Sequence, residues 1–214
     1  MKNKGLILDI KRGRGVEQGL TRAAEVLLSG GAVVFPTESF YGLGINVTDE
    51  RAIHRLFDIK KRREDHPVLI LIPSREALDQ YVTHIPDAVG LLIDQFWPGG
   101  LTIVLEAGSR VSPLLTADTG KIGVRLSSHP IATGLARAAG VAITGTSANV
   151  SGAPPCTDAA DVLQSIGRSV DLILDAGKTM GGRGSTVLDM TVDPPLIVRE
   201  GMVSRDRLEE WIAL

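Results

Sequence analysis

The sequence predicts a single α/β domain in which helices pack on a twisted, mixed β-sheet. Segments with apolar residues at helical spacing alternate with short apolar runs that are typical of buried strands. Two late apolar runs, at 186–188 and 196–198, have no helix between them, which favours a mixed over a purely parallel sheet. No linker-like or low-complexity segment divides the 214 residues. Residues 1–214 are therefore expected to form one domain.

The first half of the chain alternates helix and strand, with recognisable start and stop signals. Gly30-Gly31 supplies a left-handed helix stop, Pro36 ends an apolar run, and Asp49 is a suitable N-cap. The expected elements are a helix at 16–29, a strand at 32–35, a helix after Asp49 and a strand at 68–72.

The second half continues the alternation and brings the expected number of strands to about seven. A turn at Trp97-Pro98-Gly99-Gly100 separates an expected helix that ends at residue 96 from an expected strand that begins at residue 101. The expected elements are a helix at 88–96, strands at 101–105 and 122–126, a helix from Pro130, a strand at 141–144, a helix at 158–166, strands at 172–174, 186–188 and 196–198, and a helix at 205–212.

Composition excludes several classes of protein. A formal net charge of −2 excludes the overall basic excess of a histone-like protein, so contacts with nucleotide or RNA must come from local cation clusters. One cysteine, Cys156, cannot form an internal disulfide or a multi-thiolate metal site. The four histidines lack metal-ligand spacing, so no protein-bound metal is predicted. No apolar run has the length of a signal peptide or the ~20 residues of a membrane span, and a cytoplasmic protein is expected.

Two groups of cations allow either a structural or a functional interpretation. Lys60-Lys61-Arg62-Arg63 ends a helical pattern, where cations are favoured by the helix dipole, but Lys and Arg also neutralise triphosphates. Arg125 interrupts an apolar strand. A buried guanidinium needs an anionic partner, which is either a structural acid or the carboxylate of a substrate. The residues alone leave both questions open.

Three loops have the composition of ligand-binding segments. Residues 36–44, PTESFYGLG, follow a strand, where α/β folds place ligands, although a plain connection explains them equally well. Residues 143–152 are dense in hydroxyl, amide and glycine groups that can bind phosphate or a nucleobase. Asn149 stands where a nucleophile elbow centred on Ser147 would need glycine. Residues 181–187 lack the lysine and the spacing of a P-loop.

Taken in order, seven motifs resemble those of the YrdC family of threonylcarbamoyl-AMP synthases. They span about residues 16–201 and read PTESFYGLG, KKR, FWPGGLTIVL, VRLSSHPIA, TSANVSG, STVLD and IVREG. The resemblance implies a YrdC-like single domain with a concave basic cavity. It also implies the reaction: L-threonine and bicarbonate form a carbamate, which attacks the α-phosphate of ATP and expels pyrophosphate with Mg²⁺ assisting.

The resemblance also implies roles for individual residues. The family's threonine-contacting positions match Thr37, Arg125 and Ser185, with Thr144 a weaker candidate. Its nucleotide-contacting positions match Lys60, Arg62, Thr116, Ser147, Asn149 and Arg199. Lys60 and Arg62 are the candidate catalytic residues, because the leaving pyrophosphate gathers negative charge that cations stabilise. Arg199 is expected to assist them.

The sequence departs from the family pattern at several positions. Arg63 stands where proline is frequent, Leu71 where many members have histidine, and Ser39-Phe40 where Thr-Val is usual. These departures leave the strictness of threonine selection open. The chain resembles the short family branch, which lacks an extra C-terminal domain and works with separate proteins that transfer the threonylcarbamoyl group to tRNA. Free tRNA is expected to bind weakly or indirectly.

Two alternatives to synthase activity remain at this point. One is a divergent paralogue that binds RNA or nucleotide without making the intermediate. The other is an unrelated nucleotide-binding enzyme on a similar fold, because a fold does not fix chemistry.

Overall fold

A computed structural model describes residues 6–13 and 15–214, and its eleven strands form two mixed sheets. The predicted α/β class is confirmed, but the strands do not form the single sheet that was expected. The five-stranded sheet has the order β1 (Leu6–Asp9), β9 (Leu172–Asp175), β2 (Val33–Pro36), β3 (Tyr41–Gly44) and β8 (Thr146–Ser147). The six-stranded sheet has the order β11 (Leu196–Arg199), β10 (Thr186–Asp189), β5 (Leu101–Glu106), β6 (Lys121–Arg125), β4 (Ile70–Leu71) and β7 (Ile143–Thr144).

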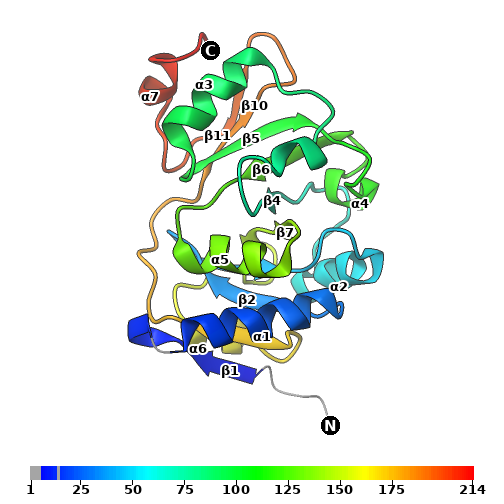
Figure 1. Ribbon diagram of the computed structural model, residues 1–214, viewed down its shortest axis with the longest axis vertical. Coiled ribbons are helices and arrows are strands. Elements are labelled where there is room, and N and C mark those ends of the chain that lie inside the picture. Colours follow the sequence, from blue (N-terminus) through cyan, green and yellow to red (C-terminus); the bar gives the residue numbers. More distant parts are fainter. Residues whose placement is uncertain (1–5, 14) are drawn as a thin grey trace.

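Seven α-helices in the described residues flank the sheets (Figure 1). They are α1 (Val16–Leu28), α2 (Glu50–Lys60), α3 (Asp87–Phe96), α4 (Pro113–Thr116), α5 (Pro130–Ala139), α6 (Ala159–Ser165) and α7 (Arg205–Glu209), with short 3-10 turns at Lys11–Gly13 and Leu78–Gln80. Figure 1 shows α1 and α5 running side by side at the five-stranded sheet, while α3 lies at the far end with β5, β10 and β11. The helices expected at 16–29, after Asp49, at 88–96 and from Pro130 are confirmed within a residue or two.

The core has two parts. The larger cluster runs through both sheets and includes α2 and α3, whereas a smaller one fills the space between α1, α5 and strands β2 and β9. In the smaller cluster the helices meet through small residues such as Ala23 and Ala132, both fully buried. Gly134 lies so close to Leu20 that an added Cβ would approach its side chain to 2.9 Å. Small residues therefore set the short separation of α1 and α5.

Strand β3 lies in a segment for which only a polar loop was expected. It pairs antiparallel with β2, and residues 37–40 connect the two. Gly42 and Gly44 of β3 lie against the ring of Phe35, and a Cβ at Gly44 would come within 2.8 Å of that ring. Glycine is depleted in strands in general, so a strand that needs it for close packing has a weak sequence signal.

Strands β1 and β8 and helix α4 were also not expected. The two strands lie at the edges of the five-stranded sheet, and β8 has only two residues. Helix α4 is a single turn that Ser112 caps through a hydrogen bond from the Leu114 N–H. Such short elements depend on tertiary neighbours more than on local preference.

The two sheets are joined by hydrogen bonds between the end of β3 and strand β7. The Thr144 N–H donates to the Ile45 carbonyl (3.2 Å), and the Ile45 N–H donates to Thr144 Oγ1 (3.2 Å). Thr144 Oγ1 in turn donates to the Leu43 carbonyl (2.9 Å). Because Thr144 is fully buried, its hydroxyl is a structural link between the sheets.

This link predicts the effect of replacing Thr144 by valine, which keeps the shape of the side chain and removes the hydroxyl. Thr144→Val leaves the buried Ile45 N–H without its partner, which costs about 1–3 kcal/mol of the free energy of unfolding. The melting temperature is expected to fall by several degrees in a thermal melt. Thr21→Val is the matched control, because Thr21 is exposed on α1. Equal melting temperatures for the two variants would contradict this role of Thr144.

Candidate functional site

A cavity of about 750 Å³ is lined by strands of both sheets. One face of the six-stranded sheet forms its floor. Lys121, Gly123 and Arg125, which are alternate residues of β6, all line it, as expected for side chains on one face of a strand. Strand β5, which pairs with β6, and strand β10, which pairs with β5, add Thr102, Val104, Val187 and Asp189. The floor thus has charged groups toward both ends of β6 and apolar groups between them.

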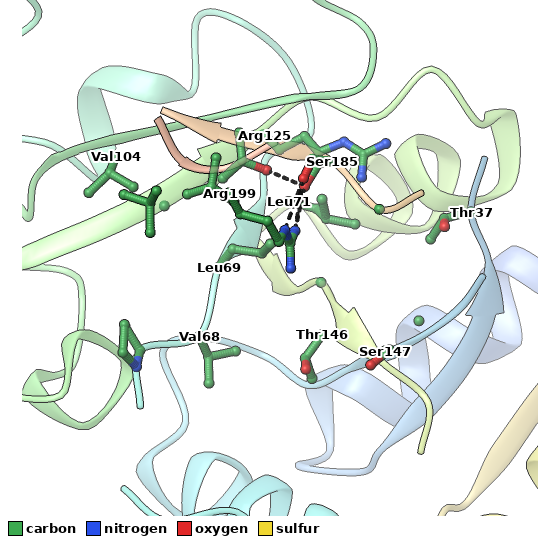
Figure 2. A pocket seen from close by; sticks show the side chains of 18 of the residues that line it. Thr37, Val68, Leu69, Leu71, Val104, Arg125, Thr146, Ser147, Ser185 and Arg199 are labelled. Carbon is green, nitrogen blue, oxygen red and sulfur yellow. Dashed lines mark hydrogen bonds between the residues drawn. The ribbon is translucent and has the colours of Figure 1, made fainter. Parts of the chain in front are cut away.

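The opposite wall comes from the five-stranded sheet and its loops. Figure 2 shows Arg125, Ser185 and Arg199 on one side of the cavity and Thr146 and Ser147 across from them. Thr37 lies at the start of the 37–40 connection, where its hydroxyl donates to the Phe40 carbonyl (2.6 Å). The loop predicted to hold ligands after β2 and the hydroxyl-rich loop at β8 therefore face the same cavity.

Arg125 is only 6% exposed, and its guanidinium makes two contacts within the protein. Nε donates to the Gly99 carbonyl (2.7 Å), and Nη2 lies 2.6 Å from Glu38 Oε2 in an ion pair that lacks hydrogen-bond alignment. Among the described residues, Nη1 takes part in neither contact, and Arg125 lines the cavity. The structural ion pair considered from the sequence is present, and Arg125 also lies on the cavity surface.

Glu38 is tied to the loop that begins α5 as well as to Arg125. Oε1 accepts hydrogen bonds from Ser127 Oγ (2.9 Å), from the Ser128 N–H (2.6 Å) and from Ser128 Oγ (2.9 Å). Burial opposes ionisation of this carboxyl, but the charge of Arg125 and these hydrogen bonds outweigh it and hold the pKa of Glu38 below its usual value. Glu38 is therefore a charged partner of Arg125.

Arg199 and Ser185 form a second polar group beside Arg125. Arg199 Nη2 donates to the Ser185 carbonyl (2.9 Å), and Ser185 Oγ accepts from Thr102 Oγ1 (2.8 Å). Burial, and then the nearby charge of Arg125, lower the pKa of Arg199. Two guanidinium groups this close together create an anion-attracting region.

The segment after Arg199 is fixed against Ser185 by close packing. A Cβ on Gly201 would lie 2.2 Å from the Gly184 carbonyl oxygen, so only glycine fits there. Thr186 Oγ1 accepts hydrogen bonds from the Gly201 N–H (2.8 Å) and the Val203 N–H (3.0 Å). The predicted glycine loop and the IVREG motif thus meet to orient Arg199.

Arg62 lines the cavity, and it is held by backbone carbonyls. Its Nη2 donates to the Pro67 carbonyl (2.8 Å) and its Nε to the His66 carbonyl (3.3 Å). Burial lowers its pKa from the usual value. The side chain is therefore oriented before any ligand arrives.

Lys60 is placed differently from its expected position in the cavity. It is 1% exposed and does not line the cavity, because its Nζ donates to the carbonyls of Ser147 (2.5 Å) and Asn149 (2.8 Å). Burial, and then the charge of Arg62, lower its pKa to about 8. In this structure the Lys60 ammonium group binds backbone carbonyls, and its predicted nucleotide contact stays a prediction.

Three more predicted residues lie behind the cavity surface. Thr144 links the sheets, and Thr116, which is 3% exposed, donates through its hydroxyl to the Pro113 carbonyl (2.9 Å). The Asn149 amide donates to the carbonyls of Val150 (3.0 Å) and Ala153 (2.6 Å). In this structure these side chains support the cavity wall, and their predicted ligand contacts stay predictions.

The structure adds cavity residues that were not predicted. Lys121 and Asp189 form an ion pair of 3.1 Å at the end of the floor away from Arg125, and Thr119 lies near them on the cavity surface. The expected strand began at 122, one residue too late to include Lys121. Extending the strand by one residue and applying its two-residue alternation would have placed Lys121 on the face of Arg125.

Together the cavity-lining residues favour an anionic ligand. Five are cationic, namely Arg62, Lys121, Arg125, Arg183 and Arg199, and two are acidic, namely Asp189 and Glu200. In the part of the chain that the structure describes, no group of three or more His, Cys, Asp or Glu residues is placed to hold a metal ion. Over the same residues, no helix is both long and apolar enough to cross a membrane.

Comparison with known proteins gives consistent matches. A family model for Sua5, YciO and YrdC proteins, described as telomere recombination, matches residues 25–201. A curated threonylcarbamoyl-AMP synthase of Pyrococcus abyssi is 38% identical over 190 residues, which are 89% of this chain and 56% of that protein. The chain thus spans about half the length of this relative.

Two solved structures resemble the fold closely. The crystal structure of P. abyssi Sua5 complexed with L-threonine superposes with a TM-score of 0.93 at 36% identity and covers 97% of this chain and 61% of that one. The crystal structure of Escherichia coli YciO has a TM-score of 0.86 at 27% identity and covers 95% of this chain and 99% of that one. The resemblance inferred from the motifs is confirmed, and the chain belongs to the Sua5/YciO/YrdC family.

Proposed function

We propose that this protein forms threonylcarbamoyl-AMP and pyrophosphate from L-threonine, bicarbonate and ATP. The observation that carries the proposal is the cavity itself, which has Arg125 and Arg199 across from Ser147 and which Arg62 also lines. Such a site suits a substrate with both a carboxylate and a polyphosphate. The similarity to proteins named threonylcarbamoyl-AMP synthase supports this choice among anionic ligands.

In the proposed reaction the threonine amine attacks bicarbonate and forms a carbamate with loss of water. A carbamate oxygen then attacks the α-phosphorus of ATP, and the bond to the leaving pyrophosphate breaks. The protein supplies no covalent nucleophile in this scheme. Positioning of the two substrates and neutralisation of phosphate charge are the sources of rate enhancement.

Threonine is proposed to bind at the Arg125 end of the floor. Arg125 presents part of its guanidinium to the cavity, and Thr37 and Ser185 line the same region. A planar guanidinium binds a carboxylate with two parallel hydrogen bonds, which fixes orientation as well as charge. The complex of P. abyssi Sua5 with L-threonine supports a threonine site in this fold.

The triphosphate is proposed to lie between Arg62, Arg199 and the Ser147 loop. Mg²⁺ is proposed to arrive with ATP. The carboxylates on the cavity surface are Asp189, which is paired with Lys121, and Glu200, which lies 3.7 Å from Arg183. Mg²⁺ commonly keeps several waters and binds phosphates with one or two carboxylates, so this sparse set fits an ion that ATP carries.

The product is proposed to pass to separate proteins that transfer the threonylcarbamoyl group to tRNA. These partners, like the weak or indirect contact with tRNA, follow from the family resemblance.

The first test of the proposal omits one substrate at a time. Pyrophosphate release from ATP is expected to need both threonine and bicarbonate, because only their carbamate provides the attacking oxygen. Mass spectrometry of the complete mixture should show threonylcarbamoyl-AMP. Serine should replace threonine with a loss of roughly 10- to 200-fold, since one missing methyl group is worth about 1–3 kcal/mol. Equal pyrophosphate release without threonine would refute the assignment, and ATP binding without product would favour a nucleotide-binding paralogue.

The second test separates the two roles of Arg125. Arg125→Lys keeps a cation beside Glu38 but loses the planar fork, so the KM for threonine should rise about tenfold or more while the KM for ATP changes little. Arg125→Ala should in addition lower the melting temperature without substrates, because Glu38 loses its buried partner. Steady-state kinetics and thermal melts of both variants measure these effects. An unchanged threonine KM in Arg125→Ala would remove Arg125 from the substrate site.

The third test concerns nucleic acid. With a formal net charge of −2, free tRNA is expected to bind weakly and with a steep dependence on salt concentration, through phosphate contacts. A filter-binding titration over about 50–200 mM salt should show a large loss of affinity. Tight, sequence-selective binding that persists at high salt would instead support the RNA-binding alternative.

A further inference from the structure

Lys60 is a fully buried cation whose position is unexpected for a residue that binds a nucleotide directly. It is the last residue of α2, is 1% exposed, and is absent from the cavity surface. Its ammonium group lies behind the 147–149 segment, where it contacts two carbonyl oxygens. A buried ammonium is costly unless it is hydrogen-bonded, so these contacts define its place in the fold.

The same segment is held at several other points. The Ala148 N–H donates to the Tyr41 carbonyl (2.8 Å), and the Ser151 N–H donates to the Lys60 carbonyl (2.8 Å). Cys156 Sγ donates to the Ala148 carbonyl (3.2 Å). Lys60 therefore contacts this segment through both its side chain and its backbone.

The direction of the two carbonyls matters for an anionic ligand. Ser147 lines the cavity, and a carbonyl oxygen turned toward the cavity would repel phosphate oxygens. Lys60, which does not line the cavity, binds the Ser147 and Asn149 carbonyls and compensates their partial negative charge. At this wall the cavity is then left with the side chains of Thr146 and Ser147.

We propose that Lys60 is a positioning residue: it binds the Ser147 and Asn149 carbonyls and so presents the 146–151 segment to the phosphates of ATP without contacting them. The inference rests on the proposed function for the identity of the ligand. In this proposal Arg62 and Arg199 contact the phosphates directly. Lys60 instead keeps the 146–151 segment, which forms the facing wall, in position.

The decisive variant is Lys60→Met, which has a similar unbranched side chain and no donor. Lys61→Met is the matched control, because Lys61 is the adjacent residue with an exposed side chain. Hydrogen–deuterium exchange of the ligand-free proteins is followed by mass spectrometry. Loss of two charge-assisted hydrogen bonds should make the amides of residues 146–153 exchange about tenfold faster or more in Lys60→Met. Exchange in α1 and α5 should match the wild type, and the control should match it everywhere.

A double-mutant cycle then asks whether Lys60 acts through the segment. ATP affinity is measured by calorimetry for Lys60→Met, Ser147→Ala and the double variant. If Lys60 acts by presenting Ser147, the loss in the double variant is smaller than the product of the two single losses. Independent contacts with phosphate would multiply the two losses. Lys60→Arg, which keeps the donors, should recover part of the affinity.

Several results would overturn the proposal. Exchange of residues 146–153 in Lys60→Met that equals the wild type would show that Lys60 does not hold the segment, and multiplicative losses would show a direct contact. Should Lys60→Met fail to fold, Lys60→Gln, which keeps one donor on a shorter side chain, is compared in the same way. The exchange measurement needs no substrate. It would therefore still test the role of Lys60 if the protein proved not to make threonylcarbamoyl-AMP.

Discussion

The ion pair between Arg125 and Glu38 is the interaction on which the site depends. Arg125 belongs to the six-stranded sheet, and Glu38 lies in the connection between two strands of the other sheet. Hydrogen bonds from Ser127 and Ser128 extend the contact to the start of α5. A guanidinium inside an apolar strand is tolerated only with a partner, so Arg125 needs Glu38. Because the two residues come from different sheets, their pair joins the sheets beside the cavity. Together with the Thr144 hydroxyl, it fixes how the sheets face each other.

The cavity combines cations on its surface with side chains that support its wall. Arg62 and Arg199 line it, and backbone carbonyls hold both. Lys60 and Asn149 lie one layer deeper and bind the backbone of the facing loop. In the proposed role of Lys60, a buried cation shapes an anion site without contacting the ligand. An ammonium that binds carbonyl oxygens removes groups that would repel the ligand, and it does so before the ligand arrives.

Sequence patterns were most informative for long amphipathic helices and for the order of the motifs. The sequence signals were strong where one segment carries the whole pattern of apolar residues by itself. This holds for the helices at 16–28 and 50–60 and for the strand at 101–106. Strand β3 was missed because Gly42 and Gly44 serve packing against Phe35 rather than strand propensity. The division of the strands into two sheets also had no local signal in the sequence. It depends on which strands far apart in the chain pair with each other, as β2 and β9 do.

The sequence by itself determined the α/β class, the family, and the presence of hydroxyl-rich loops and cations at recognisable spacings. It left the partner of Arg125 undecided between an acid and a ligand. Only the tertiary structure showed that Glu38 is that partner, that Lys121 shares the cavity floor, and that Lys60 lies beneath the wall. The physical reason is that the type of a residue fixes which functional groups it carries. The burial of its side chain and the groups that it contacts are set by segments far apart in the chain.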